Sequence, residues 1–155
     1  MNKQAIVNEI VARLDAELRR YAKAAQVAHA EATDEQSRAE NKYDTRGLEA
    51  SYLAHGQSRQ VVETEQAREQ YASLPVRAFE AAEPIGIGAL IELKHDGEHL
   101  WYFLGPAAGG TEVECAGQEV LVITPQAPLG RLLAGRRRSE QIQFGRVNYR
   151  IVQVQ

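Results

Sequence analysis

The stretch EATDEQSRAENKYDTRG, residues 31–47, is a polar bend between two long segments that have helical periodicity. It carries five acidic side chains against three basic ones, so the bend itself is acidic. Because two helices joined by a short polar connection pack antiparallel, the sequence predicts a helical hairpin with this acidic tip at its far end. The acids of the tip are Glu31, Asp34, Glu35, Glu40 and Asp44.

The first arm, residues 4–32, has apolar or small residues at alternating steps of four and three, which is the heptad seam of a coiled coil. The large residues come first and the alanines last, so the partner helix should approach most closely near the tip. The seam consists of Val7, Val11, Leu14, Leu18, Tyr21, Ala25, Ala28 and Ala32.

The return helix should begin at Arg38 or Asp44 and end at Leu74, and its seam is weaker. Its small residues lie near the tip, as they do in the first arm, which supports an antiparallel pair. This seam consists of Gly47, Ala50, Ala54, Val61 and Tyr71, with Leu48, Tyr52, Val62 and Leu74 beside it.

Composition changes after Leu74, where glycine, proline and β-branched residues replace helix formers. This shift predicts a hairpin over residues 1–75 and a second domain over residues 84–155. In the second domain we expect a turn at residues 95–97, between the first two of five strands. The fold class is therefore α+β, a helical hairpin followed by a small sheet domain with one short helix. The strands are expected over residues 89–93, 100–104, 119–124, 140–144 and 148–154, and the helix over residues 129–134.

The 155 residues carry a formal net charge of −3, with 44% hydrophobic and 25% charged side chains, which is typical of a folded soluble protein. The lone Cys115 excludes an internal disulfide, and no apolar run is long enough for a membrane span. We therefore expect a cytoplasmic protein that does not contact a membrane.

Self-contained catalysis is not expected from the residue patterns. The four histidines lack the spacing of metal ligands on one helix face, and no Ser/His/Asp or Cys/His arrangement can be argued from the sequence. The glycines of GIGAL, residues 86–90, precede a strand instead of leading from a strand into a helix, so they do not form a phosphate loop. We expect no stably bound cofactor.

The C-terminal part is basic. From residue 125 onward the chain has six arginines and one acid, Glu140. This set is either a solvated face or a docking surface for an acidic protein or for nucleic-acid phosphate. Because the neighbouring aromatics Phe144 and Tyr149 fall at strand positions that can be internal, we favour a protein partner. The arginines are Arg131, Arg136, Arg137, Arg138, Arg146 and Arg150.

The acidic tip also has two interpretations. A polar loop between helices is commonly charged, so the tip can be a solvated connection. Alternatively, carboxylates at the end of a long arm can enter a recessed site of another macromolecule and supply oxygen ligands to Mg²⁺, which binds through one or two carboxylates together with water and phosphates.

Two segments, WYFLGPAAGG (residues 101–110) and VLVITPQAPLGRLLAGR (residues 120–136), resemble the C-terminal domain of the Gre family of bacterial transcript-cleavage factors. Members of that family have a Y-x-x-G pattern at a strand end and an S-P-L-G/A-x-A-L-x-G-K motif that opens a short helix. Pro128, Leu129, Gly130, Leu133 and Gly135 match the motif, while Arg136 replaces the lysine and Ala127 the serine.

The tip is similar to the family's D-x-x-E-N pattern followed by an aromatic residue, over residues 37–41 and Tyr43. The resemblance implies a coiled-coil hairpin joined to an FKBP-like domain that docks on RNA polymerase at the rim of its secondary channel. It also implies a monomer whose partner-binding residues are Pro128, Leu129, Gly130, Arg131, Leu133 and Arg136.

In the family, the tip acids help the polymerase's own active site to hold a second Mg²⁺ and to cleave the 3′ end of backtracked RNA. By resemblance Glu40 takes the metal-binding role, only within the polymerase complex, and Asp34, Glu35 and Asp44 are the other candidate acids. The protein would contact the nascent RNA end only through polymerase and would not be an enzyme by itself.

Three alternatives remain open. The family's aspartate falls on Ser37, which allows a modulator that occupies the channel without promoting cleavage. The FKBP-like domain type allows a peptidyl-prolyl isomerase, although the consecutive aromatics of residues 101–103 indicate no aromatic pocket. A hairpin that only dimerises is the third.

Overall fold

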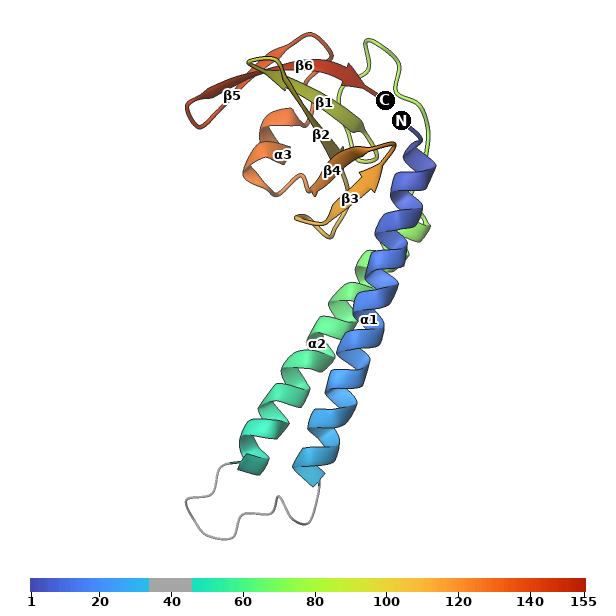
Figure 1. Cartoon of the computed structure of the whole chain (residues 1–155), viewed down its shortest axis with the longest axis vertical. Coiled ribbons are helices and arrows are strands. Elements are labelled where there is room, and N and C mark those ends of the chain that lie inside the picture. The colour runs from blue at the N-terminus through green and yellow to red at the C-terminus, as the bar shows by residue number, and fades with distance from the viewer. Residues whose placement is uncertain (34–45) are drawn as a thin grey trace. The chain divides into compact units, whose positions relative to one another are not determined.

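The computed structural model describes residues 1–33 and 46–155, and it confirms the α+β fold class (Figure 1). None of the helices within these ranges is long and apolar enough to cross a membrane. The elements in chain order are α1 (Lys3–Thr33), α2 (Arg46–Ala72), β1 (Leu90–His95), β2 (Glu98–Leu104), β3 (Glu112–Cys115), β4 (Gln118–Ile123), α3 (Pro128–Leu133), β5 (Gln141–Phe144) and β6 (Val147–Val154).

The chain divides into two compact units, one made of Met1–Val11 with Glu69–Gln155 and the other of Ala12–Arg68. The first unit, called the β unit below, contains the sheet and the adjoining ends of both helices. Ile6, Ile10 and Tyr71 explain this grouping, since their side chains are at most 1% exposed. This division differs from the boundary at residues 75–84 that the change in composition indicates. The helix ends belong to the β unit because they bury apolar side chains, which composition does not reveal.

The second unit, the hairpin unit, pairs α1 with α2 (Figure 1). Leu14 of α1 and Ala67 of α2 are buried, and the Arg68 guanidinium Nε lies 2.6 Å from Asp15 Oδ1 on the other helix. Figure 1 shows the two helices of this unit side by side and running in opposite directions, as the polar bend predicts. The expected first residues of the return helix, Arg38 and Asp44, lie outside the described residues.

The β unit has one six-stranded sheet in the order β3-β4-β2-β1-β6-β5. All neighbouring strands are antiparallel except β2 and β4, which are parallel. The five predicted strands are present, and the turn at Asp96 and Gly97 joins β1 to β2. The expectation of five strands was wrong by one: β3 was missed because its four residues place a single buried valine, Val113, between two glutamates.

The two faces of the sheet have different coverings. On one face, Leu129 and Leu133 of α3 join a core cluster with Leu93, Leu104 and Ile151 of three strands. On the other, Phe103, Val120 and Val122 are buried, and the Tyr71 ring lies 6.4 Å from that of Phe103. Because successive residues of a strand point to opposite faces, both faces can bury apolar side chains.

Candidate partner-binding site

The helix α3 begins at Pro128, in the middle of the segment that carries the resemblance. Proline suits the first turn of a helix because its missing N–H would have no intrahelical acceptor there. Ala127 is the N-cap residue and makes no side-chain cap hydrogen bond. The serine of the family motif would fall at this position, where its hydroxyl could accept a hydrogen bond from the first helical turn.

Three of the six predicted partner-binding residues have structural roles. Leu129 and Leu133 are 8% and 0% exposed in the core cluster. A Cβ atom at Gly130 would lie 1.9 Å from the backbone oxygen of Thr124, so only glycine allows this approach of helix and loop. Gly135 has φ of +80°, which permits the sharp end of the motif.

Fewer of the predicted partner-binding residues are therefore exposed than the sequence indicates. Of the predicted residues, Pro128, Arg131 and Arg136 are exposed. Leu132, which was not predicted, is 37% exposed beside them. Together with the exposed Ala134 and Gly135, these four residues are the part of the motif that can touch a partner.

The glycine of the Y-x-x-G pattern, Gly105, is explained by Tyr71. A Cβ atom at Gly105 would lie 1.9 Å from the Tyr71 hydroxyl oxygen. That hydroxyl donates a hydrogen bond of 2.9 Å to the backbone oxygen of Ala107, and burial raises the pKa of Tyr71 above its usual value of 10.0. The sequence placed Tyr71 on the hairpin seam, and only the fold shows that it packs against the motif glycine.

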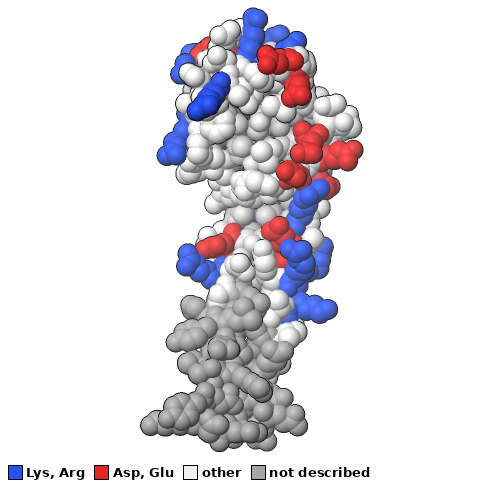
Figure 2. Space-filling model, turned by 60° about the vertical axis from the view of Figure 1, so that its left-hand side comes forward, with Lys and Arg blue, Asp and Glu red and all other residues white. Residues whose placement is uncertain are grey.

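The basic C-terminal group is distributed over several elements. Arg136 lies 3.2 Å from Glu140, and the Nε atoms of Arg137 and Arg138 donate to the backbone oxygens of Ala82 and Val152. Figure 2 shows basic and acidic side chains gathered over different parts of the β unit. The structure thus brings together only part of the predicted basic group.

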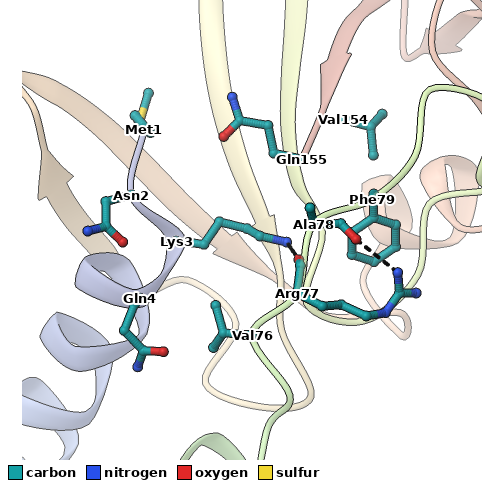
Figure 3. A pocket seen from close by; sticks show the side chains of 10 residues that line it. All are labelled: Met1, Asn2, Lys3, Gln4, Val76, Arg77, Ala78, Phe79, Val154 and Gln155. Carbon is teal, nitrogen blue, oxygen red and sulfur yellow. Dashed lines mark hydrogen bonds between the residues drawn. The ribbon is translucent and has the colours of Figure 1, made fainter.

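A pocket of about 510 Å³ in the β unit contains Lys3, a residue with no functional signal in the sequence (Figure 3). The Lys3 ammonium donates to the backbone oxygens of Arg77 and Gly88. The Lys3 Nζ and the Arg77 guanidinium both lie over the Phe79 ring, 4.8 Å and 4.3 Å from its centroid. Arg77 is also paired with Glu83, which is 2.9 Å from its Nη1.

Burial of Lys3 lowers its pKa from 10.5 to about 8, and the charge of Arg77 adds to this effect while that of Glu83 opposes it. A buried amine with two carbonyl acceptors is satisfied by the protein itself. We therefore assign Lys3 to fixing the first turn of α1 against the segment that precedes the sheet.

The predicted tip acids Asp34, Glu35, Glu40 and Asp44, and also Ser37, lie outside the described residues. Their metal-binding role remains a prediction from the sequence. Within the described ranges, no group of three or more histidine, cysteine, aspartate or glutamate side chains could hold a metal ion.

The two histidines beside the turn between β1 and β2 have separate partners. His95 Nδ1 lies 3.1 Å from the backbone oxygen of Asn148, whereas His99 Nδ1 lies 2.5 Å from Glu92 Oε1. They do not form a common site.

No protein-family model matches the chain, and no curated protein matches it either. Solved structures similar to the chain include those of Gre-type factors. The GreA factor homolog 1 (Gfh1) of Thermus thermophilus is 21% identical, with 94% of each chain covered and a TM-score of 0.40. Gfh1 of Thermus aquaticus is 20% identical over 95% of this chain and 92% of that chain, with a TM-score of 0.38. The elongation factor GreA/GreB of Nitrosomonas europaea is 17% identical over 69% of this chain and 91% of that chain, with a TM-score of 0.36.

Proposed function

We propose that this protein is a transcription elongation factor that binds RNA polymerase through its β unit and acts in the secondary channel through the acidic tip. It has no catalytic centre of its own in this proposal. Glu40, helped by Asp34, Glu35 or Asp44, would contribute a ligand to a Mg²⁺ ion shared with the polymerase active site. This ion would activate water for cleavage of backtracked RNA.

The observation that carries the proposal is the structural context of the resembling motif. The resemblance implies that the motif opens the short helix of the domain, and α3 begins at Pro128. Gly105 and Gly130, one glycine from each resembling segment, lie at positions where a Cβ atom would be 1.9 Å from a neighbouring atom. The motif therefore has a packing role in this chain, in addition to its sequence similarity to the family motif.

The test is cleavage of backtracked RNA by purified bacterial RNA polymerase, with and without the protein. The wild-type chain should increase the cleavage rate, and Glu40→Ala should abolish the increase without changing polymerase affinity. Glu31→Ala is the matched control, since it removes an acid of the same bend that is not among the candidate ligands. If Glu40→Ala retains the activity, Glu40 does not have the proposed role.

A second candidate function is supported by Ser37, which occupies the position of the family's aspartate. A protein that lacks this carboxylate could occupy the channel and slow transcription without promoting cleavage. The same assay distinguishes the two functions. Binding with slower elongation and no added cleavage would select the modulator, and Ser37→Asp should then introduce some cleavage.

A further inference from the structure

The face of the sheet opposite α3 has an exposed region that the proposed function does not use. Strand registers place Lys94, His99 and Arg150 on this face, in one row across β2, β1 and β6. All three are exposed. Since neighbouring strands are about 4.8 Å apart, the row spans about 10 Å. We call this region the cationic face, and it comprises Glu92, Lys94, His99, Trp101, Gln118, Gln141, Gln143, Asn148, Arg150 and Gln153.

Two like charges lie directly opposite each other on the cationic face. Lys94 and Arg150 are Cα partners in the pairing of β1 with β6. Directly opposed like charges destabilise a pair of strands. Neither side chain has an ion pair within the described part of the chain. An anion bound between them would remove this repulsion.

Most acidic side chains of the sheet lie on the face opposite the row of Lys94, His99 and Arg150. Glu112, Glu114 and Glu119 of β3 and β4 lie on the face that carries α3, because Glu112 is opposite Leu121 and Glu114 opposite Glu119. The one acid of the cationic face is Glu92, and it contacts His99 Nδ1. The two cations are therefore not neutralised from their own face.

An aromatic surface adjoins the cations. Trp101 is two residues from His99 on the same strand and face, and it is the only tryptophan of the chain. Trp101 is partly exposed. A planar ring can stack on a partly exposed tryptophan.

We propose that the cationic face binds single-stranded nucleic acid, with phosphates on Lys94 and Arg150 and a base stacked at Trp101. Surfaces that bind single strands without sequence preference combine cations with a nearby aromatic ring in this way. The amides of Gln118, Gln141, Gln143, Asn148 and Gln153 add groups that both donate and accept hydrogen bonds, as base edges require.

An acidic protein is the competing occupant. It would use the cations but would have no need for Trp101 or for the surrounding amides. The sequence favoured a protein partner because Phe144 and Tyr149, the aromatics near the basic group, fall at strand positions that can be internal. The fold places Tyr149 beside the core cluster on the α3 face. It puts Trp101 on the same face as Lys94 and Arg150, diagonal to Lys94 across β1 and β2.

The experiment titrates the full-length protein with a labelled single-stranded RNA of about 12 nucleotides, a length within the usual range of such sites. Fluorescence anisotropy measures binding, and quenching of Trp101 reports stacking. Single-stranded DNA and a blunt RNA duplex are tested in parallel. The variant K94Q/R150Q removes the two cations, and R131Q/R136Q removes two arginines at α3 as the matched control.

We expect both single strands to bind more tightly than the duplex and to quench Trp101. K94Q/R150Q should weaken RNA binding about tenfold and lower the slope of log affinity against log salt by about 1.4, because each phosphate contact on a single strand contributes about 0.7. R131Q/R136Q should leave the Trp101 quenching and most of the affinity unchanged.

Three results would overturn the proposal. The first is equal weakening by both double variants, and the second is binding without any change at Trp101. The third is displacement of the RNA by poly-glutamate at equal charge, which would identify a surface for acidic protein. Polymerase is absent from these assays, so their failure leaves the proposed polymerase function untouched.

Discussion

At the scale of the residue, the motif glycines should be intolerant of a side chain. Gly130→Ala would place a methyl group 1.9 Å from a backbone oxygen that cannot rotate away. We expect a loss of about 1–3 kcal/mol in the free energy of unfolding, as in other overpacked sites. The measurement is urea unfolding followed by the fluorescence of Trp101, which lies in the β unit.

Gly56→Ala is the matched control for this prediction. Gly56 lies within α2, and a Cβ atom there would meet no other atom within 4 Å. The substitution should therefore stabilise the hairpin unit by about 0.5–1 kcal/mol, because alanine favours the helix. Circular dichroism of the helices measures this change, since Trp101 lies in the other unit. Equal effects of the two substitutions would contradict the packing role of Gly130.

The environment of Lys3 leads to a second prediction at the residue scale. The free energy of unfolding should depend on pH. The pKa of Lys3 is about 8 in the folded protein against 10.5 in the unfolded chain, so unfolding takes up a proton between these values. Stability should consequently rise with pH from about 8 toward 10.5. Above about pH 10 the raised pKa of Tyr71 acts in the opposite direction, since the unfolded chain loses that proton first.

The comparison of wild type with Lys3→Met isolates the lysine. Urea unfolding at pH 7, 8, 9 and 10 should show stability of the wild type rising relative to the variant over the upper part of this range. Parallel curves for the two proteins would show that Lys3 keeps an ordinary pKa.

At the scale of the element, the sequence predicts what periodicity and turn residues encode. The predicted end of the first arm is one residue from the observed end of α1, and strands β1, β2 and β4 to β6 are found within a few residues of their expected positions. The hairpin seam was less accurate. Thr64 and Ala67 are buried although neither belongs to the predicted seam, and Val62 is 50% exposed.

These errors have a common physical cause. Between residues 58 and 68 of α2, the buried side chains are those of Thr64 and Ala67, so hydrophobicity alone does not reveal this part of the buried face. β3 is similar, because one buried valine between exposed glutamates gives too short an alternation to predict a strand. In both α2 and β3, these residues are buried by an element that is distant in the sequence, so the local sequence cannot predict their burial.

At the scale of the whole molecule, the candidate surfaces depend on strand register. The arginines of the C-terminal part look like one basic group in the sequence, yet the fold separates Arg131 of α3 from Arg150, which pairs with Lys94. Trp101 and Lys94 come from different strands and share a face only through the pairing of β1 with β2. A sequence pattern predicts the types of these residues but not their combination.

The division of the chain leads to the last prediction, that the β unit folds without the hairpin unit. The test is a variant in which residues 12–68 are replaced by a Gly/Ser linker of about four residues, a common length for tight connections. A short linker should suffice, because the two helices are in contact near the junction. Nε of Arg68, the residue directly before Glu69, lies 2.6 Å from Oδ1 of Asp15, which is about one turn beyond Val11. The variant keeps Ile6, Ile10 and Tyr71, so it should unfold cooperatively in urea.

A fragment of residues 84–155, the domain expected from composition alone, is the informative control. It lacks those three side chains and should expose Phe103, which is 1% exposed in the whole chain. Burial of one large apolar side chain contributes about 1.5–3 kcal/mol, so the fragment should be markedly less stable than the linker variant. Equal stability of the two would place the boundary at residues 75–84 after all, and would show that the helix ends contribute little to the β unit.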